Sequence, residues 1–193
     1  MSMSRRHFLS GLSGACLSAA IPSLGLASPK RAGSRLDQLV PLIDPVLDLR
    51  NPHTNERVFT RFYTLTGYDM AAVNQINALM RDWRENEVVQ IDVRLFWALA
   101  AIRQAAMKDG HSGQIQLNSG YRSKKTNDNL RKLGYHTAVN SMHLKGQAND
   151  IVLEGTKVAD IARYAQWLQI GGTGHYRNDF VHIDSGPIRL WTE

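Results

Sequence analysis

Short strand-like runs and longer helical runs follow one another along this chain without a regular order. Two runs of alternating apolar residues flank the turn-rich stretch NPHTN and predict a β-hairpin over residues 46–64. A parallel α/β sheet would require a helix after each strand, and the chain does not keep that order. The pattern therefore predicts an α+β fold, with a mainly antiparallel sheet and flanking helices.

The helical segments are identified by apolar residues three and four positions apart. Asp69 and Ser123 stand where helix N-caps are expected. Helices are predicted at residues 69–86, 91–110, 123–134 and 158–172, and further strands within 113–123, 147–153, 172–176 and 179–184.

The first 27 residues have the composition of an export signal. Arg5 and Arg6 precede a modestly apolar stretch, and cleavage is expected after Ala27. The stretch SRRHFL resembles a twin-arginine signal, whose export machinery would be a partner; an ordinary export signal is the alternative. The segment is too rich in serine and glycine to make a stable membrane span. We therefore expect a periplasmic protein, with a polar, flexible lead-in at residues 28–41.

Composition limits the chemistry of the mature chain. Cys16 is the only cysteine and lies in the predicted signal, so a disulfide framework and a cysteine nucleophile are both excluded. A lipoprotein signal would need an apolar residue at position 13, where Ser13 stands. Removing two arginines lowers the formal charge from +6 to +4, which suits an anionic partner. No nucleic-acid-binding motif is present, so we expect no nucleic-acid partner.

Three residues have the types and spacing of a metal site. His143 and Asp150 are separated by a turn at Gly146, and His182 lies on a later predicted strand. Two imidazoles and a carboxylate, with water as a fourth ligand, are typical of zinc hydrolases. The alternative is a loop histidine, a capping aspartate and a packed strand histidine, and spacing alone leaves both interpretations open.

The stretch FVHID adds a second polar pair. Side chains alternate along a strand, so His182 and Asp184 should share one face while Val181 and Ile183 face the core. Burying such a cluster without a metal or full hydrogen bonding would be costly.

The stretch SMHLKGQAND resembles the S-x-H-x-x-G-x-A-x-D signature of the M15 zinc peptidases, the group of D-alanyl-D-alanine peptidases and the hedgehog domain. SGYRS resembles the arginine-bearing turn of those enzymes. GHYRNDFVHIDSGPIRLW is similar to the C-terminal block of their murein endopeptidase K branch. The resemblance covers roughly residues 42–191 and implies a zinc peptidase domain at residues 42–193.

The resemblance also assigns roles to individual residues. It implies that His143, Asp150 and His182 bind one zinc ion per chain. Arg122 matches the arginine that steadies an oxyanion or a substrate carboxylate, a surface salt bridge being the alternative. Ser141 would bind substrate or shape its loop.

The general base and one substrate contact remain open in the sequence. Many M15 enzymes have a glutamate three residues before the last histidine, where this chain has the shorter Asp179. Strand geometry favours Asp184 for facing the metal, with a role in orienting a ligand histidine as the alternative. His175 falls where the branch has a residue near the site, so it is a further candidate for binding substrate.

The function implied by the resemblance is an exported zinc-dependent murein endopeptidase acting on peptidoglycan, with L,D-type meso-diaminopimelate cross-links favoured. The alternatives are a D,D-carboxypeptidase or D,D-endopeptidase on the same fold, and a non-catalytic wall-binding module.

Overall fold

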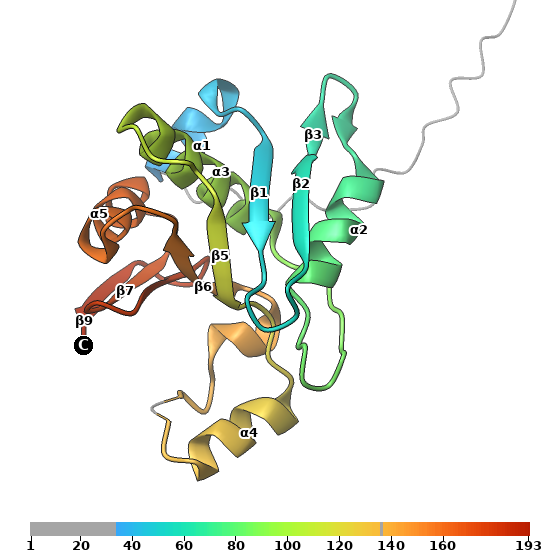
Figure 1. Cartoon of the computed structure of the whole chain (residues 1–193), viewed down its shortest axis with the longest axis vertical. Coiled ribbons are helices and arrows are strands. Elements are labelled where there is room, and N and C mark those ends of the chain that lie inside the picture. The colour runs from blue at the N-terminus through green and yellow to red at the C-terminus, as the bar shows by residue number, and fades with distance from the viewer. Residues whose placement is uncertain (1–33, 136) are drawn as a thin grey trace, which may run out of the picture.

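The computed structural model describes residues 34–135 and 137–193 and confirms the predicted α+β fold. Figure 1 shows a central sheet with helices packed beside it, and α4 at the opposite end of the molecule from α1. The helices are α1 (Arg35–Leu39), α2 (Met70–Leu79), α3 (Val93–Lys108), α4 (Lys124–Lys132) and α5 (Val158–Leu168), with 3-10 turns η1 (Val40–Leu42) and η2 (Met142–Lys145).

Seven strands form the main sheet, in the order β2-β1-β5-β6-β8-β7-β9. Its pairs are antiparallel except β1 with β5 and β7 with β9, so the prediction of a mainly antiparallel sheet is confirmed. The strands are β1 (Val46–Arg50), β2 (Arg57–Arg61), β5 (Ile115–Ser119), β6 (Ala148–Leu153), β7 (Gly172–Tyr176), β8 (Phe180–Asp184) and β9 (Arg189–Thr192); β3 (Tyr63–Thr64) and β4 (Gly67–Tyr68) form a separate pair.

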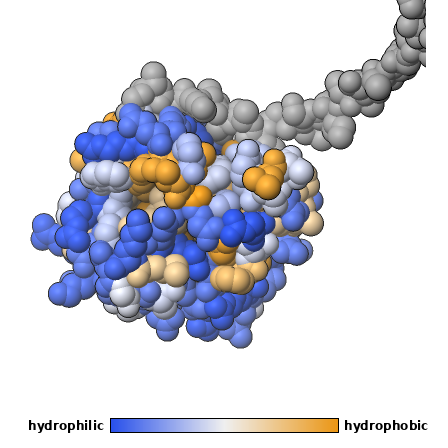
Figure 2. Space-filling model, turned by 90° about the horizontal axis from the view of Figure 1, so that it is seen from above, coloured by the Kyte–Doolittle hydropathy of each residue, from blue (hydrophilic) through white to orange (hydrophobic). Residues whose placement is uncertain are grey.

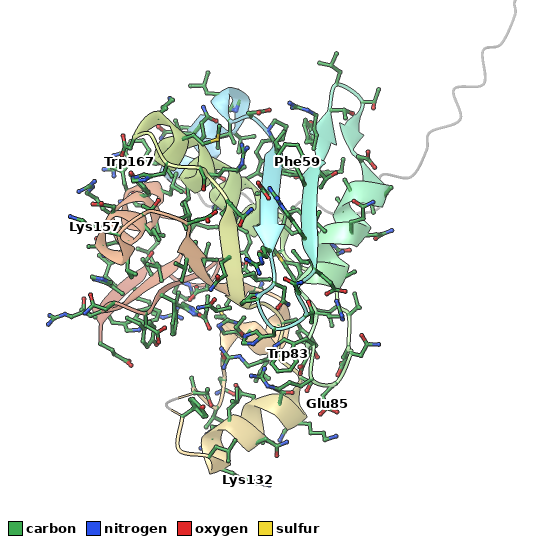
Figure 3. All side chains as sticks on the ribbon, in the orientation of Figure 1. Phe59, Trp83, Glu85, Lys132, Lys157 and Trp167 are labelled. Carbon is green, nitrogen blue, oxygen red and sulfur yellow. The ribbon has the colours of Figure 1, made fainter. Side chains whose placement is uncertain are left out.

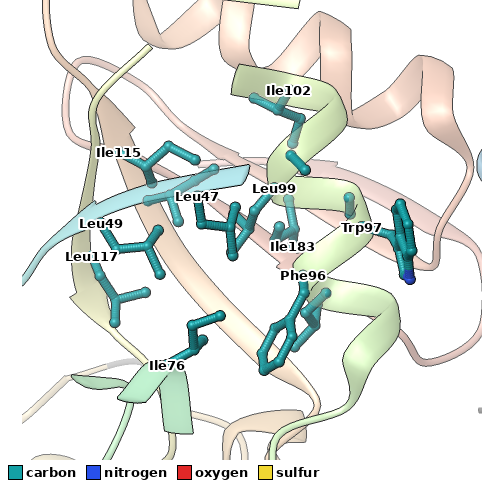
Figure 4. Packing of buried hydrophobic residues seen from close by; sticks show 14 of the residues in the cluster. Leu47, Leu49, Ile76, Phe96, Trp97, Leu99, Ile102, Ile115, Leu117 and Ile183 are labelled. Carbon is teal, nitrogen blue, oxygen red and sulfur yellow. The ribbon is translucent and has the colours of Figure 1, made fainter. Parts of the chain in front are cut away.

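The hydrophobic core lies between one face of the sheet and helices α2, α3 and α5. Apolar side chains of β1 and β5 point toward α3 (Figure 4). On β8, Val181 and Ile183 are fully buried on this core face, as predicted. Strand alternation therefore leaves His182 and Asp184 on the opposite face, away from the helices.

Two of the predicted helix starts are confirmed by their caps. The Asp69 side chain accepts hydrogen bonds from the backbone of Ala71 and Ala72, at the start of α2. The Ser123 side chain accepts one from Thr126, at the start of α4. Each cap satisfies backbone N–H groups that have no partner within the helix.

The predicted helix at 69–86 is wrong beyond residue 79, because α2 ends at Leu79. Asp82 and Glu87 form an antiparallel bridge, and Asn86, between them, has a left-handed φ of 52°. Apolar residues continue at helical spacing past the end of the helix, which concealed it in the sequence. The loop that replaces it, residues 80–92, carries Trp83 and Arg84 beside the site described below.

The predicted flexible lead-in is wrong from Ser34 onward, where α1 and η1 pack on the domain. Leu36 is 1% exposed, and the Ser34 hydroxyl donates a hydrogen bond to the carbonyl of Leu168 at 3.4 Å. Leu39 and Val40 also pack against the core, and Asp37 pairs with Arg94 at 2.6 Å. Residues 28–33 lie outside the described residues, as do the predicted signal at 1–27 and Cys16.

Within the part of the chain that the structure describes, no helix is both long enough and apolar enough to cross a membrane. Figure 2 shows one face of the molecule, on which hydrophilic residues predominate and hydrophobic residues form separate patches.

Candidate metal centre

Neighbouring strands bring two of the three predicted ligands together. Asp150 on β6 and His182 on β8 are direct partners in the antiparallel register, so their side chains project from the same face. His143 lies on η2, which Ser141 caps by accepting a hydrogen bond from the His143 backbone. Gly146 ends this turn with a φ of 63°, the left-handed conformation that the sequence predicted there.

The three side chains converge on one point. His143 Nε2 and His182 Nδ1 lie 3.2 Å apart, and Asp150 Oδ1 lies 3.2 Å from the first and 2.8 Å from the second. All three residues are buried. The structure therefore brings His143, Asp150 and His182 together as the sequence predicted.

The outer nitrogen of each imidazole has its own partner. His143 Nδ1 lies 2.6 Å from the carbonyl oxygen of Gly120, which can only accept a hydrogen bond. His182 Nε2 lies 3.1 Å from Asp184 Oδ2. In the neutral tautomers that these partners favour, both inner nitrogens present lone pairs to Asp150. Three acceptors facing one another need a cation between them, so this donor set fits a zinc ion.

Electrostatics make the same point. Burial alone would raise the pKa of Asp150, but His143 and His182 hold it well below its usual value, so the carboxylate stays ionised. Burial lowers the pKa of His143. Burial also acts to lower the pKa of His182, but hydrogen bonds to Asp150 and Asp184 raise it to about 9. Without a metal, a proton on His182 supplies the positive charge that the cluster requires.

Asp184 lies on the far side of His182 from the ligand triangle. The prediction that it shares a face with His182 is confirmed by their hydrogen bond. Its carboxylate is 0% exposed and accepts hydrogen bonds from the backbone of Gly172 at 3.0 Å and Gly186 at 2.7 Å, and from Arg189 at 2.7 Å. The expectation that Asp184 faces the open side of the metal is therefore wrong.

Asp179 occupies a different position. It is exposed, in the turn between β7 and β8, where its backbone donates a hydrogen bond to the carbonyl of Tyr176 at 3.1 Å. It lines a cavity of about 1020 Å³ that also contains the ligand triangle. Of the two candidate bases, only Asp179 is open to this cavity.

Arg122 lines the cavity and is 8% exposed. Its Nη2 lies 3.3 Å from Asp150 Oδ2, and its Nε donates to the Ser119 hydroxyl at 3.2 Å. Burial lowers the pKa of Arg122, and the charge of Asp150 opposes that effect. Arg122 therefore forms a buried ion pair with a candidate metal ligand, and not the surface salt bridge that was the alternative prediction from the sequence.

Of the two other residues proposed from the sequence to bind substrate, Ser141 lies at the cavity and His175 does not. Ser141 lines the cavity as well as capping η2. His175 pairs with Val181 across β7 and β8, on the face opposite His182, and does not line the cavity, so the structure does not bring it to the site. Asn149 lies on the core face, where its amide contacts Met80 Sδ at 3.7 Å.

Sequence reasoning missed the aromatic wall of the cavity. Trp191 on β9 lies with its ring centroid 5.3 Å from that of His182, and its Nε1 donates to the Tyr176 hydroxyl at 3.3 Å. A Cβ at Gly174 would come within 2.4 Å of the Trp191 ring, so only glycine leaves room for it. The strand β9 was not predicted, and the glycines of GGTG were the available signal.

An α+β sheet that carries two histidines and an aspartate in a cavity is the arrangement that the resemblance to the M15 zinc peptidases implies. The sequence model of the family described as peptidoglycan L,D-endopeptidase MepK matches residues 44–191. The chain belongs to this family.

Individual relatives agree with the family match. The chain is 39% identical over 147 residues to peptidoglycan L,D-endopeptidase MepK of Escherichia coli K12. The aligned residues make up 76% of this chain and 79% of that protein. It is 34% identical over 147 residues to the probable peptidoglycan L,D-endopeptidase MepK of Haemophilus influenzae, covering 76% of this chain and 78% of the relative.

Proposed function

We propose that this protein is an exported, zinc-dependent endopeptidase that cleaves L,D-type cross-links in peptidoglycan. The observation that carries the proposal is the convergence of His143 Nε2, Asp150 Oδ1 and His182 Nδ1 on the cavity floor. The activity for which the relatives are named supplies the substrate class. The domain at residues 42–193 would carry the activity, with one zinc ion per chain.

The three converging atoms are the proposed zinc ligands, and the Gly120 carbonyl and Asp184 keep the two imidazoles in the required tautomers. Bound zinc supplies a Lewis acid that activates water and polarises the scissile carbonyl. Asp184 is proposed to act through His182, as a positioning residue.

Proton transfer is assigned to Asp179. A general base must reach both the attacking water and the leaving amine, and so must be open to the cavity. Asp179 meets that condition, and Asp184 is enclosed by Gly172, Gly186 and Arg189. Arg122 has N–H donors beyond the two bound to Ser119 and Asp150, and is proposed to stabilise negative charge on the substrate.

Digestion of purified sacculi with and without a chelator tests the activity. We expect chromatography to show muropeptides released from L,D-cross-linked sacculi by the zinc-loaded chain, and none after chelation. Release from D,D-cross-links instead would show that the protein is a peptidoglycan peptidase with a different substrate class. Zinc binding without any release would indicate a non-catalytic wall-binding module.

Export is proposed to use the twin-arginine machinery and to place the protein in the periplasm. The support is the sequence SRRHFL at the N-terminus. Changing Arg5 and Arg6 to lysine should leave the precursor in the cytoplasm, as seen by cell fractionation. Periplasmic delivery of that double variant would instead indicate an ordinary export signal.

A further inference from the structure

His53, Trp83 and Arg84 form a stacked cluster at the cavity that Arg122 also lines. The ring of His53, in the β1–β2 turn, stacks on Trp83 with centroids 4.7 Å apart and planes 17° apart. The guanidinium of Arg84 lies over the Trp83 ring, with Cζ 4.1 Å from the centroid. Figure 3 shows Trp83 between the β1–β2 hairpin and the end of the molecule that carries α4.

The stack is fixed at its base. His53 Nε2 lies 3.1 Å from the carbonyl oxygen of Asn118, which ties the ring to the end of β5. The backbone of Arg84 donates a hydrogen bond to Asp82 Oδ1 at 3.0 Å. A cation held on an indole face in this way keeps its charge and loses little further freedom when it binds an anion.

Arg84 has no carboxylate partner among the described residues, although three acids flank it in the sequence. Glu85 pairs with Lys125 at 2.8 Å. Asp82 accepts hydrogen bonds from backbone N–H groups, and Glu87 accepts one from the Tyr121 hydroxyl at 2.9 Å. The neighbouring acids are thus engaged elsewhere, and the guanidinium of Arg84 is available to an external anion.

Arg84 and Arg122 line the same cavity as the ligand triangle. Arg122 already has an anionic partner in Asp150, and Arg84 has none.

The proposed substrate places an anion close to the reacting bond. In a cross-link to the D-centre of meso-diaminopimelate, the carbon that carries the scissile amide nitrogen also carries a free carboxylate. That carboxylate enters the cavity whenever the amide reaches the metal centre. Resting on the proposed function, we infer that Arg84 binds this carboxylate and makes the enzyme selective for cross-links in which it is free.

The test uses two cross-linked dimers that differ only in this group, one with the carboxylate and one with a carboxamide. The zinc-loaded full-length protein should cleave the carboxylate dimer with a kcat/KM roughly 10- to 100-fold higher, the usual worth of a charge-assisted hydrogen bond. Arg84→Gln should lose that preference by slowing only the carboxylate dimer. Arg84→Lys should keep part of it, because a lysine retains the charge without the planar fork.

Lys132→Gln is the matched control, since Lys132 is an exposed cation on the adjacent helix α4 that does not line the cavity. It should leave the preference unchanged. The inference is overturned if Arg84→Gln retains the preference, or if it slows both dimers equally.

Calorimetric binding of the two dimers separates failure of this inference from failure of the proposed function. If the protein cleaves neither dimer, the proposed activity is wrong. The role of Arg84 then still requires that Arg84→Gln weaken binding of the carboxylate dimer alone. Equal binding of both dimers by the unaltered protein would overturn it.

Trp83 is a positioning residue in this scheme, and its variants give an independent check. Trp83→Leu should raise KM for the carboxylate dimer and leave kcat unchanged, because it frees Arg84 without touching the metal centre. Trp83→Phe should restore most of the affinity, since it keeps an aromatic face under the guanidinium. A parallel fall in kcat for both variants would indicate a general structural role and contradict the assignment.

Discussion

Each histidine of the candidate metal centre presents a different ring nitrogen to Asp150. His143 presents Nε2 and His182 presents Nδ1 to Asp150, because the Gly120 carbonyl and Asp184 occupy the other nitrogens. The orientation of the His182 ring decides the role of Asp184. Because Asp184 contacts Nε2, it lies on the opposite side of the ring from Nδ1, the atom that faces the other two candidate ligands.

Exchanging each aspartate for asparagine separates the two roles. Asp179→Asn should keep zinc and lower kcat by roughly 10²–10⁴, the usual worth of general acid–base catalysis. Asp184→Asn should weaken zinc binding roughly 10- to 100-fold and leave kcat close to that of the unaltered protein once zinc is saturating. Zinc titration and muropeptide release, measured on the same preparations, check both. Full zinc affinity with lost turnover in Asp184→Asn would return the proton-transfer role to Asp184.

The ligand residues were predictable from the sequence, whereas the surroundings of Asp184 were not. Strand alternation and a motif place His182 and Asp184 on one face using local information alone. The enclosure of Asp184 depends on Gly172, which lies on the neighbouring strand β7, and on the turn after β8, which brings Gly186 and Arg189 back to the carboxylate. Contacts between elements are set by sheet order, and sheet order has no local signature.

At the scale of elements, strand and helix periods were reliable guides where each element packs on the core. The prediction was wrong where tertiary contacts replaced periodicity. The helix predicted at 69–86 gives way to a loop after residue 79, and the parallel strand β9 joins the sheet edge without an alternating pattern. Both wrongly predicted regions border the cavity. The residues that line its sides were therefore less predictable than the three candidate ligands.

The loop of residues 80–92 is anchored to α4 by one buried carboxylate. Asp82 is 1% exposed and accepts hydrogen bonds from the backbone of Ser123 at 2.9 Å and of Arg84 at 3.0 Å. Burial alone would raise the pKa of Asp82, but these hydrogen bonds lower it below 3.8. Its contribution to stability is therefore present above pH 3.8 and is lost as the pH falls through the lower pKa of the folded state.

Asp82→Asn should lower the free energy of unfolding by about 1.5–3 kcal/mol at pH 7, the range for hydrogen bonds to a charged group. The deficit should shrink as the pH falls below 3.8, where the parent carboxylate itself becomes protonated. Denaturant unfolding of both proteins across that range is the measurement. A deficit independent of pH would mean that the carboxylate charge contributes nothing. Asp128→Asn is a suitable control, because Asp128 makes only an exposed pair with Lys124 on α4.

At the scale of the whole molecule, core and chemistry occupy opposite faces of one sheet. Helices α2, α3 and α5 cover the apolar face, and the ligand triangle lies on the other. Asp150 and His182 are therefore held in place by strands whose apolar neighbours, Ile151, Val181 and Ile183, are already fully buried. We therefore expect the scaffold to form without a metal, unlike a small zinc-binding domain that folds only around its ion.

Removal of zinc should thus abolish activity and leave the fold. Chelation is expected to leave the far-ultraviolet circular dichroism unchanged. It should also lower the Tm, because zinc at about 1,000 times its Kd adds about 4 kcal/mol to the stability of the folded state. His143→Ala should show the same lowered Tm with or without zinc, since it lacks a ligand. Loss of the circular dichroism signal on chelation would contradict this prediction, because it would show that the fold depends on the bound metal.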